Sequence, residues 1–579
     1  MSLIHQGFHD PGRWLKDRLW SLERAFERAK AAGRAEDDTR IRIFFILSLF
    51  SLGFLALAIG ATRMAAFPDA DRNGGVLSAG SARADLTDRN GALLAADLLH
   101  YGLYLDPREI WDTKETRRAL AAALPELPPA KIDKALRAGK RTFLIGALTP
   151  EARGRIHDLG LPGVSFEPEQ RRIYPLGETA AHLIGFSDTG GKGLSGVERG
   201  LNDVVRTAAA NGQSVPLSID LRVQAALEDE VAKSAREFQV KGAVGLVTNV
   251  HTGEILAITS YPTFDPNQAG KSPPEALLNR AAASVFEMGS TFKTFTIAMA
   301  LDSGKVTMAS TFDTSATMQL GSRAIHDHDK VNYNMTVPEI YLKSSNIGAS
   351  RIALQAGGDN MTRYFEAFGL FKAAPVQLPE SAKPILPRRW NDDTITSASF
   401  GHAISVSPLA LAAGYGAIMN GGTYVPLTIR PMAEGARPQG RRVVSEATSR
   451  AMLDLMRMNV LHGTGHKADA LGLRVGGKTG SAEKAMGGRY VRDKLVSSFA
   501  AVFPADGPLE GDRYFVLIMM DEPVGNKETF GFRTGGFTAA PEVGRVIDRI
   551  APFLHVQRRV DPIVVASDKT ADTAAAEEH

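Results

Sequence analysis

The longest apolar run of the chain lies near its start, at residues 43–62, between Arg42 and Arg63. It carries no charge and is about as long as a helix must be to cross a bilayer once. A cleaved signal peptide is the alternative, but the run is long for one and an extended leader precedes it. Since no second run of this kind follows, the pattern predicts a single transmembrane helix at 43–62.

Residues 63–225 have a different pattern, in which turn-rich stretches such as 71–75 and 88–91 alternate with short apolar runs. A helix is predicted over 114–123. No acid–base or nucleophilic constellation stands out in this segment, and it is short for a glycosyltransferase domain. We therefore expect a separate non-catalytic module, which would act as a pedestal for the domain that follows.

From Lys241 onward, β-rich runs and helical periodicity combine. Runs at 242–250 and 255–260, joined by a turn, predict a hairpin. Further strands are expected at 473–475 leading into Lys478, at 495–503 and at 514–520, and helices at 347–356, at 409–419 and after Pro541. Strands at both ends with helices between them predict one antiparallel sheet covered on both faces, which is an α+β arrangement.

Composition limits the functional classes. The 579 residues are 44% hydrophobic and 23% charged, as in folded protein, and exceed what one domain usually holds. A net charge of +3 gives no argument for nucleic-acid binding. The absence of cysteine excludes disulfides and thiolate metal sites.

Basic residues are distributed unequally about the apolar run. Within 28–42 they are Arg28, Lys30, Arg34, Arg40 and Arg42, and within 63–77 only Arg63 and Arg72. Because the more basic flank stays in the cytoplasm, residues 1–42 are expected inside and the rest outside. Apolar residues at helical spacing between 15 and 26 indicate an interfacial or partner-binding helix in the inner tail, with a partly ordered tail as the alternative.

A candidate nucleophile is Ser290. Gly289 and Ser290 open an apolar run that predicts a buried helix from Ser290 to about Leu301. Lys293, one turn on, lies on the same face, and a lysine in apolar surroundings favours its neutral form and can take the proton of a serine. The motif alone is weak, because Ser-x-x-Lys usually means a helix cap with a solvated lysine.

Two further motifs follow. The triplet Ser344-Ser345-Asn346 is a Ser-x-Asn motif. The stretch Lys478-Thr479-Gly480-Ser481 carries Lys-Thr-Gly after glycines that let a strand edge approach a ligand. Each is weak alone, but the three motifs in this order are the pattern of penicillin-binding proteins and class A β-lactamases.

On these motifs the chain resembles a class B penicillin-binding protein, and within that class the division-type (FtsI-like) peptidoglycan D,D-transpeptidases. Six further stretches resemble the same family: Arg83–Gly91, Arg172–Pro175, Ala181–Gly185, Gly196–Glu198, Thr252–Ala257 and Tyr261–Asn267. Met288 is a departure, since proline is expected before the Gly-Ser pair. The resemblance implies a penicillin-recognising serine transferase domain on an elongated pedestal.

The expected organisation has five parts. They are a cytoplasmic tail at 1–42, the transmembrane helix at 43–62, a pedestal of the dimerisation type at 63–225, the transpeptidase domain at 226–558 and a disordered tail at 559–579. The resemblance and the charge bias together predict a single-pass inner-membrane protein with a periplasmic catalytic domain.

The resemblance also implies roles for the motif residues. Ser290 attacks the penultimate D-alanine carbonyl of a stem peptide, and Lys293 accepts its proton. Ser344 relays a proton to the leaving amine, and Asn346 holds the amide of the donor peptide. Backbone N–H groups of Ser290 and Ser481 are expected to hold the oxyanion.

The third motif is expected to bind substrate. Lys478, Thr479, Gly480 and Ser481 would form the subsite for the terminal carboxylate. No cofactor or metal is expected, since the adjacent residues of His326-Asp327-His328-Asp329 point in divergent directions and indicate a loop. Expected partners are the D-Ala-D-Ala donor and amine acceptor stem peptides, the membrane, a SEDS-type (FtsW-like) glycan polymerase and other divisome proteins, with β-lactams as inhibitors and no nucleic acid.

Other functions stay open at this point. An elongation-type transpeptidase is expected to carry Asp where this chain has Asn346. A β-lactamase or β-lactam sensor shares the Ser290 chemistry, but no glutamate after Ser344 is followed by Leu-Asn at the spacing of a class A deacylating residue. A structural scaffold would need a damaged motif, and all three motifs are intact. Septal transpeptidation is the favoured hypothesis.

Overall fold

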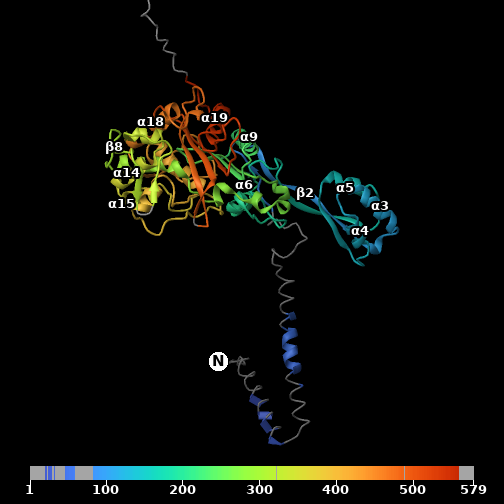
Figure 1. Ribbon diagram of the computed structural model, residues 1–579. Coiled ribbons are helices and arrows are strands. Elements are labelled where there is room, and N and C mark those ends of the chain that lie inside the picture. The colour runs from blue at the N-terminus through green and yellow to red at the C-terminus, as the bar shows by residue number, and fades with distance from the viewer. Residues whose placement is uncertain are drawn as a thin grey trace, which may run out of the picture. The chain divides into compact units, whose positions relative to one another are not determined.

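The computed structural model describes residues 82–320, 323–487 and 489–559, together with scattered positions between 20 and 58. The chain divides into two units, residues 1–80 and 81–579 (Figure 1). In the first unit residues 46–55 are helical. Among the described residues no helix is both long enough and apolar enough to span a membrane. The predicted transmembrane helix lies partly outside the described residues, as do most of the inner tail and all but the first residue of the predicted tail at 559–579.

A five-stranded antiparallel sheet forms the centre of the second unit, in the order β14-β15-β16-β6-β7. Its strands are β6 (Gly242–Asn249), β7 (Ile255–Tyr261), β14 (Gly476–Met486), β15 (Arg489–Phe503) and β16 (Tyr514–Asp521). The predicted hairpin and the strands at 495–503 and 514–520 are confirmed. The predicted strand at 473–475 is wrong, because Arg474 has a left-handed backbone (φ 57°) and the strand begins only at Gly476.

Both faces of this sheet are buried, as the sequence predicted. Alternate residues of a strand point to opposite faces, so Phe515 and Leu517 of β16 belong to one apolar core while Val516 and Ile518 belong to the other. The second core is completed by α9 (Leu221–Glu237) and α19 (Ala539–Ile550). α19 begins two residues before Pro541 and not after it, as the sequence had predicted. Proline is tolerated there because N–H groups in the first turn of a helix have no intrahelical acceptor, so the N–H that proline lacks is not needed.

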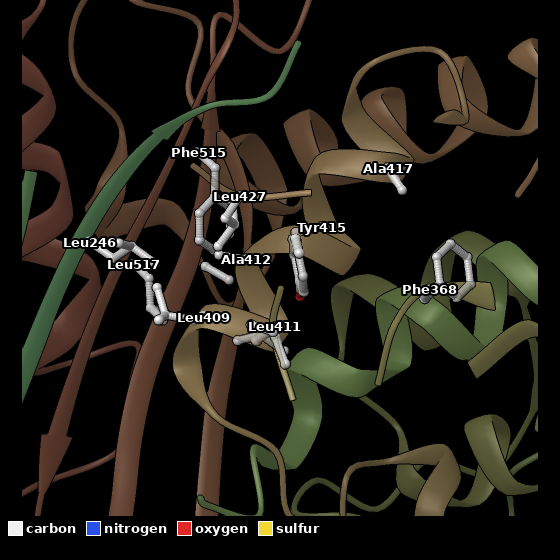
Figure 2. Close-up of a cluster of buried hydrophobic side chains, with 14 of the residues drawn as sticks. Leu246, Phe368, Leu409, Leu411, Ala412, Tyr415, Ala417, Leu427, Phe515 and Leu517 are labelled. Atoms are coloured by element: carbon white, nitrogen blue, oxygen red, sulfur yellow. The ribbon is translucent and has the colours of Figure 1, made fainter. Parts of the chain in front are cut away.

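α17 (Pro408–Met419) is the central helix of the other face. All of its residues are buried, so it is apolar on every side and packs between the sheet and α12 (Lys293–Asp302). Tyr415 stands with its ring centroid 5.4 Å from that of Phe515 on the sheet and 5.2 Å from that of Phe295 on α12. Figure 2 shows α17 beside the strands that carry Leu246 and Leu517. This packing holds α12 at a set distance from the sheet.

The remaining helices of this domain surround α12 and α17. They are α10 (Pro274–Leu277), α11 (Arg280–Ala283), α13 (Val337–Leu342), α14 (Asn346–Ala356), α15 (Gly358–Ala367), α16 (Asp392–Ser399) and α18 (Glu446–His462). Short strand pairs lie between them: β8 (Thr311–Asp313) with β11 (Asn334–Thr336), β9 (Met318–Leu320) with β10 (Arg323–Ile325), and β12 (Thr423–Tyr424) with β13 (Arg441–Arg442). The predicted helices at 347–356 and 409–419 are confirmed to within one residue.

A second sheet lies between residues 86 and 216. It contains β1 (Leu86–Thr87), β2 (Leu93–Leu105), β3 (Thr142–Leu148), β4 (Val164–Ile173) and β5 (Val215–Pro216). α3 (Thr113–Ala123), α4 (Pro129–Leu136) and α5 (Pro150–His157) pack on the end of β2 around a separate apolar core (Figure 1). The predicted helix at 114–123 is therefore confirmed. Three short helices follow: α6 (Ala181–Ile184), α7 (Gly196–Gly200) and α8 (Asn202–Ala210).

A buried ionic cluster joins three of the family-like stretches. Arg83 Nε donates to Glu198 at 2.6 Å, and Arg172 Nε donates to the same carboxylate at 2.7 Å. Arg172 also pairs with Asp97, and the Glu198 side chain is fully buried. Two guanidinium groups on one buried carboxylate satisfy its charge in a low-dielectric place.

The predicted division between residues 225 and 226 falls inside α9, a continuous helix whose apolar face packs on β6 and α19. The boundary between the expected pedestal and the transpeptidase domain thus stays a prediction.

Candidate active site

Ser290 lies in a 3-10 turn, η3 (Gly289–Phe292), which runs directly into α12. The predicted helix therefore has a tighter first turn than expected and ends at Asp302, one residue past Leu301. Gly289 has φ +56°, and a Cβ there would lie 2.7 Å from the carbonyl oxygen of Ser481. Only glycine permits both this conformation and this close approach. The turn that carries Ser290 is thus pressed against β14.

Lys293 is fully buried and connects the first two motifs. Its Nζ lies 2.9 Å from Ser290 Oγ, 2.5 Å from Ser344 O, 3.0 Å from Ser344 Oγ and 2.7 Å from Asn346 Oδ1. The two carbonyl oxygens can only accept, so they take two N–H groups. A neutral amine then has its lone pair left for a serine hydroxyl, which is the arrangement a general base requires.

Electrostatics favour that neutral form. Burial is the main cause that holds the pKa of Lys293 well below its ordinary value, and the nearby charge of Lys478 lowers it further. Asp327 acts in the opposite direction and raises the Lys293 pKa. Desolvation lowers the Lys293 pKa by more than the Asp327 carboxylate raises it. Lys293 therefore has the low proton affinity that its apolar surroundings predict.

Ser344 presents two atoms to Lys293 because of its backbone. It follows α13 in a left-handed conformation, φ 57°, which costs a non-glycine residue on the order of 1–3 kcal/mol. Its N–H donates to Tyr341 O at 3.3 Å, so the bend closes tightly on the helix end. This conformation places both the carbonyl and the hydroxyl of Ser344 within 3.0 Å of Lys293 Nζ.

Asp327 holds the start of α14 in place. Its carboxylate accepts from Ser345 Oγ at 2.5 Å, from Asn346 N at 2.5 Å and from Ile347 N at 3.0 Å. A carboxylate at a helix N-terminus satisfies free N–H groups and the helix dipole. Sequence reasoning considered Asp327 only as part of a metal-like string and missed this role. In the portion that the structure describes, no group of three or more His, Cys, Asp or Glu side chains could hold a metal ion.

Lys478 lies on the edge strand β14 but is fully buried, so its side chain does not face an open cleft. Its Nζ donates to Thr479 Oγ1 at 3.3 Å and stands 5.6 Å from the ring centroid of Tyr341. Burial lowers the pKa of Lys478 to about 7. The Lys478 ammonium therefore contacts the Thr479 hydroxyl, and Lys478 loses its charge near physiological pH.

A second threonine, Thr464, accompanies this hydroxyl. The Oγ1 atoms of Thr464 and Thr479 are 2.8 Å apart, and Thr464 also donates to Asn459 Oδ1 at 3.3 Å. Asn459 in turn donates to the carbonyl of Gly477 at 2.8 Å. Thr464 was not predicted, and its place between two glycines in a loop after α18 is the one signal that the sequence offers.

β14 and the Ser290 turn are in direct contact. A Cβ on Gly480 would lie 2.9 Å from both Met288 O and Thr291 Cγ2, so glycine is required there for packing as well as for access. Ser481 Oγ accepts from Gly535 N at 3.1 Å and keeps its own hydrogen for a ligand. The structure thus brings all eight predicted site residues to one place: Lys293 with three residues around its Nζ, and four residues on β14.

Comparisons with known proteins agree with this geometry. The family model for the penicillin-binding protein transpeptidase domain matches residues 243–541, and the model for the penicillin-binding protein dimerisation domain matches residues 78–206. A Caulobacter vibrioides protein named "Probable peptidoglycan D,D-transpeptidase FtsI" is 55% identical over 97% of both chains. The chain belongs to the penicillin-binding transpeptidases.

Other penicillin-binding transpeptidases are more distant. The Escherichia coli protein named "Peptidoglycan D,D-transpeptidase FtsI" is 30% identical over 82% of this chain and 84% of its own. The crystal structure of penicillin-binding protein 3 from Mycobacterium tuberculosis, complexed with aztreonam, matches 83% of this chain and 98% of its own with a TM-score of 0.65 at 24% identity. The second unit therefore has the α+β fold of the penicillin-binding transpeptidases.

Proposed function

We propose that this chain is a peptidoglycan D,D-transpeptidase that cross-links stem peptides through a serine acyl-enzyme during cell division. The observation that carries the proposal is Lys293 Nζ, fully buried and 2.9 Å from Ser290 Oγ, with carbonyl acceptors for its two amine hydrogens. Family membership and the names of the relatives support the same reaction class.

In the proposed acylation step, Ser290 Oγ attacks the carbonyl of the penultimate D-alanine as Lys293 takes its proton. Backbone N–H groups of Ser290 and Ser481 hold the oxyanion. Ser344, which shares Lys293 Nζ with Ser290, passes a proton to the leaving D-alanine, and Asn346 binds the amide of the donor peptide. An amine of a neighbouring stem peptide then resolves the ester.

The proposed carboxylate subsite lies on β14. Ser481 offers its hydroxyl hydrogen, and Thr479, whose hydrogen points to Thr464 in the structure, turns it to the carboxylate when the substrate binds. Lys478 contributes its charge through the Thr479 hydroxyl rather than by open contact, since its side chain is buried. β-Lactams carry an equivalent carboxylate, so they are the proposed inhibitors of the same site.

We propose that the protein lies in the inner membrane with its catalytic domain in the periplasm. The apolar run at 43–62 and the excess of basic residues before it support this topology. A periplasm-dependent reporter fused after Ala566 should be active, and the same reporter fused at Arg34 should be silent. The reverse pattern would contradict this topology. A SEDS-type glycan polymerase and other divisome proteins are the proposed partners.

The septal role has its own test. Asn346 and the surrounding stretch 345–350 resemble the septal branch, where an elongation-type relative is expected to carry Asp. Intact cells can be labelled with a fluorescent penicillin before and after depletion of this protein. Depletion should remove label that is concentrated at the division site. Loss of label along the side wall would favour the elongation branch.

A further inference from the structure

Three buried hydroxyl groups form a chain beneath the catalytic residues. Thr294 directly follows Lys293, and its Oγ1 lies 3.0 Å from Tyr341 Oη and 2.9 Å from Tyr415 Oη. Tyr415 Oη lies 2.7 Å from the carbonyl oxygen of Thr291. Thr294 and both tyrosines are 0% exposed. The proposed reaction uses none of these three hydroxyls.

The direction of the chain follows from its last acceptor. The Thr291 carbonyl oxygen can only accept, so Tyr415 Oη donates its one hydrogen to it. Tyr415 Oη must then accept from Thr294, and Thr294 Oγ1 must accept from Tyr341. Each hydroxyl in the series thus has a single orientation that satisfies the others, and burial raises the pKa of both tyrosines, which keeps their hydrogens in place.

The chain connects the segments that carry the reacting groups. Thr291 belongs to the turn of Ser290, and Thr294 lies beside Lys293 at the start of α12. Tyr341 is on α13, three residues before Ser344, and its N-terminal neighbours anchor that helix with a capping box. Tyr415 is on α17, where Figure 2 shows it among the buried side chains of the core.

The distances around Lys293 depend on these segments. Lys293 Nζ reaches from α12 to acceptors that follow α13, namely Ser344 O and Asn346 Oδ1. The Tyr341–Thr294 hydrogen bond spans the same two helices, one residue along from Lys293. The Tyr341 ring also faces Lys478 Nζ, so it borders the third motif.

We propose that Thr294 is a positioning residue for acylation, which through the hydroxyls of Tyr341 and Tyr415 holds Lys293 against Ser344 and holds the turn of Ser290 in register with it. This inference rests on the proposed function. It adds a residue that the motifs do not contain and that touches no substrate.

A looser contact between α12 and α13 would change the proton affinity of Lys293. Water would enter around an amine that is now fully desolvated, and its pKa would rise toward the ordinary value. The charged groups that face Lys293 are Lys478 on β14 and Asp327 before α14, and neither belongs to the hydroxyl chain. Acylation would then need a higher pH, because the general base must be neutral.

The test is the second-order rate of acylation of the full-length, detergent-solubilised protein by a fluorescent penicillin between pH 6 and 10. Thr294→Val keeps the shape of the side chain and removes the hydroxyl. Its pH midpoint should rise by about one unit, which lowers the rate near neutral pH about tenfold. Thr294→Ser restores the hydroxyl and should return the midpoint to the parent value.

Thr296→Val is the matched control. Thr296 is also buried on α12, but its hydroxyl donates to Ser399 O at 2.8 Å and does not belong to the hydroxyl chain. It should keep the parent midpoint. If Thr294→Val does not fold, Tyr341→Phe serves instead, since it leaves the Thr294 hydrogen paired with Tyr415 and should shift the midpoint in the same direction by less.

The outcomes separate the two proposals. A parent protein that is not acylated at all overturns the proposed function and this inference with it. A parent that is acylated, with a Thr294→Val or Tyr341→Phe midpoint equal to that of the parent, overturns only the positioning role. A uniform loss of rate at every pH in Thr294→Val would assign the hydroxyl chain to folding alone.

Discussion

Raising the pH should weaken the recognition of carboxylate-bearing reagents before it affects others. Burial brings the pKa of Lys478 to about 7, so its charge is lost on the alkaline side of neutrality. The second-order acylation rate constant reports ionisations of the free enzyme, so this pKa applies to it directly. The ratio of rates for two reagents, a β-lactam with its carboxylate and an electrophile without one, cancels the shared need for neutral Lys293.

The size of the effect follows from the charged fraction. Lys478 is charged in about half of the molecules at pH 7 and in about one in ten at pH 8, so the ratio should fall about fivefold over that unit. The fall stops when only the neutral amine remains. A hydrogen bond to a charged group contributes about 1.5–3 kcal/mol, which sets the total loss at about 10- to 100-fold.

Two lysines on β14 make the assay specific. Lys478→Met keeps most of the buried volume without a charge, and its ratio should be low and independent of pH. Lys484→Met is the matched control. Lys484 pairs with Asp521 at 2.7 Å and Glu522 at 2.9 Å, and these hydrogen bonds overcome its desolvation and raise its pKa, so the parent profile should persist.

A flat ratio in the parent protein between pH 6 and 9 would refute this reasoning. So would equal losses of rate for both reagents in Lys478→Met, because that result would assign Lys478 to the proton relay or to the fold. The carboxylate-anchoring role would then be withdrawn.

Three further predictions concern other parts of the structure. Asp327→Asn removes the charge that caps α14 and should slow acylation about tenfold with both reagents, measured in the same assay, while the exposed neighbour variant Asp329→Asn should not. Glu198→Gln leaves two buried guanidinium groups without their carboxylate and should lower the free energy of unfolding by about 3–5 kcal/mol in urea titration; a change under about 1 kcal/mol would contradict the buried cluster. Gly289→Ala places a Cβ 2.7 Å from Ser481 O at a positive φ and should abolish labelling by fluorescent penicillin, so a variant labelled at the parent rate would show that β14 and the Ser290 turn are not in close contact.

Features set by local sequence could be predicted. The β6–β7 hairpin follows from two β-rich runs and a turn, and one helical turn is enough to bring Lys293 to Ser290. The burial of α17 follows from its uninterrupted apolar residues. In each case the predictive signal lies in residues that are close in the chain, so the local pattern carries the information.

Features that depend on long-range packing could not be predicted. Asp327 caps α14 from 18 residues before Ser345, with β11 and α13 between them, so no local pattern links the two residues. Lys478 is buried because helices from earlier in the chain cover the strand, and a strand pattern alone does not record that cover. The strand predicted at 473–475 failed at Arg474, where the backbone turns left-handed for reasons that residue type does not reveal.

The central claim is that Ser290 is the nucleophile and Lys293 its base. The direct measurement is intact-protein and peptide mass spectrometry after reaction with a β-lactam, for the parent, Ser290→Ala and Lys293→Ala. We predict one adduct per chain on the peptide that contains Ser290, none in Ser290→Ala, and a greatly slowed adduct in Lys293→Ala with every electrophile tried. A stable adduct in Ser290→Ala, or a parent adduct on another residue, would contradict the account.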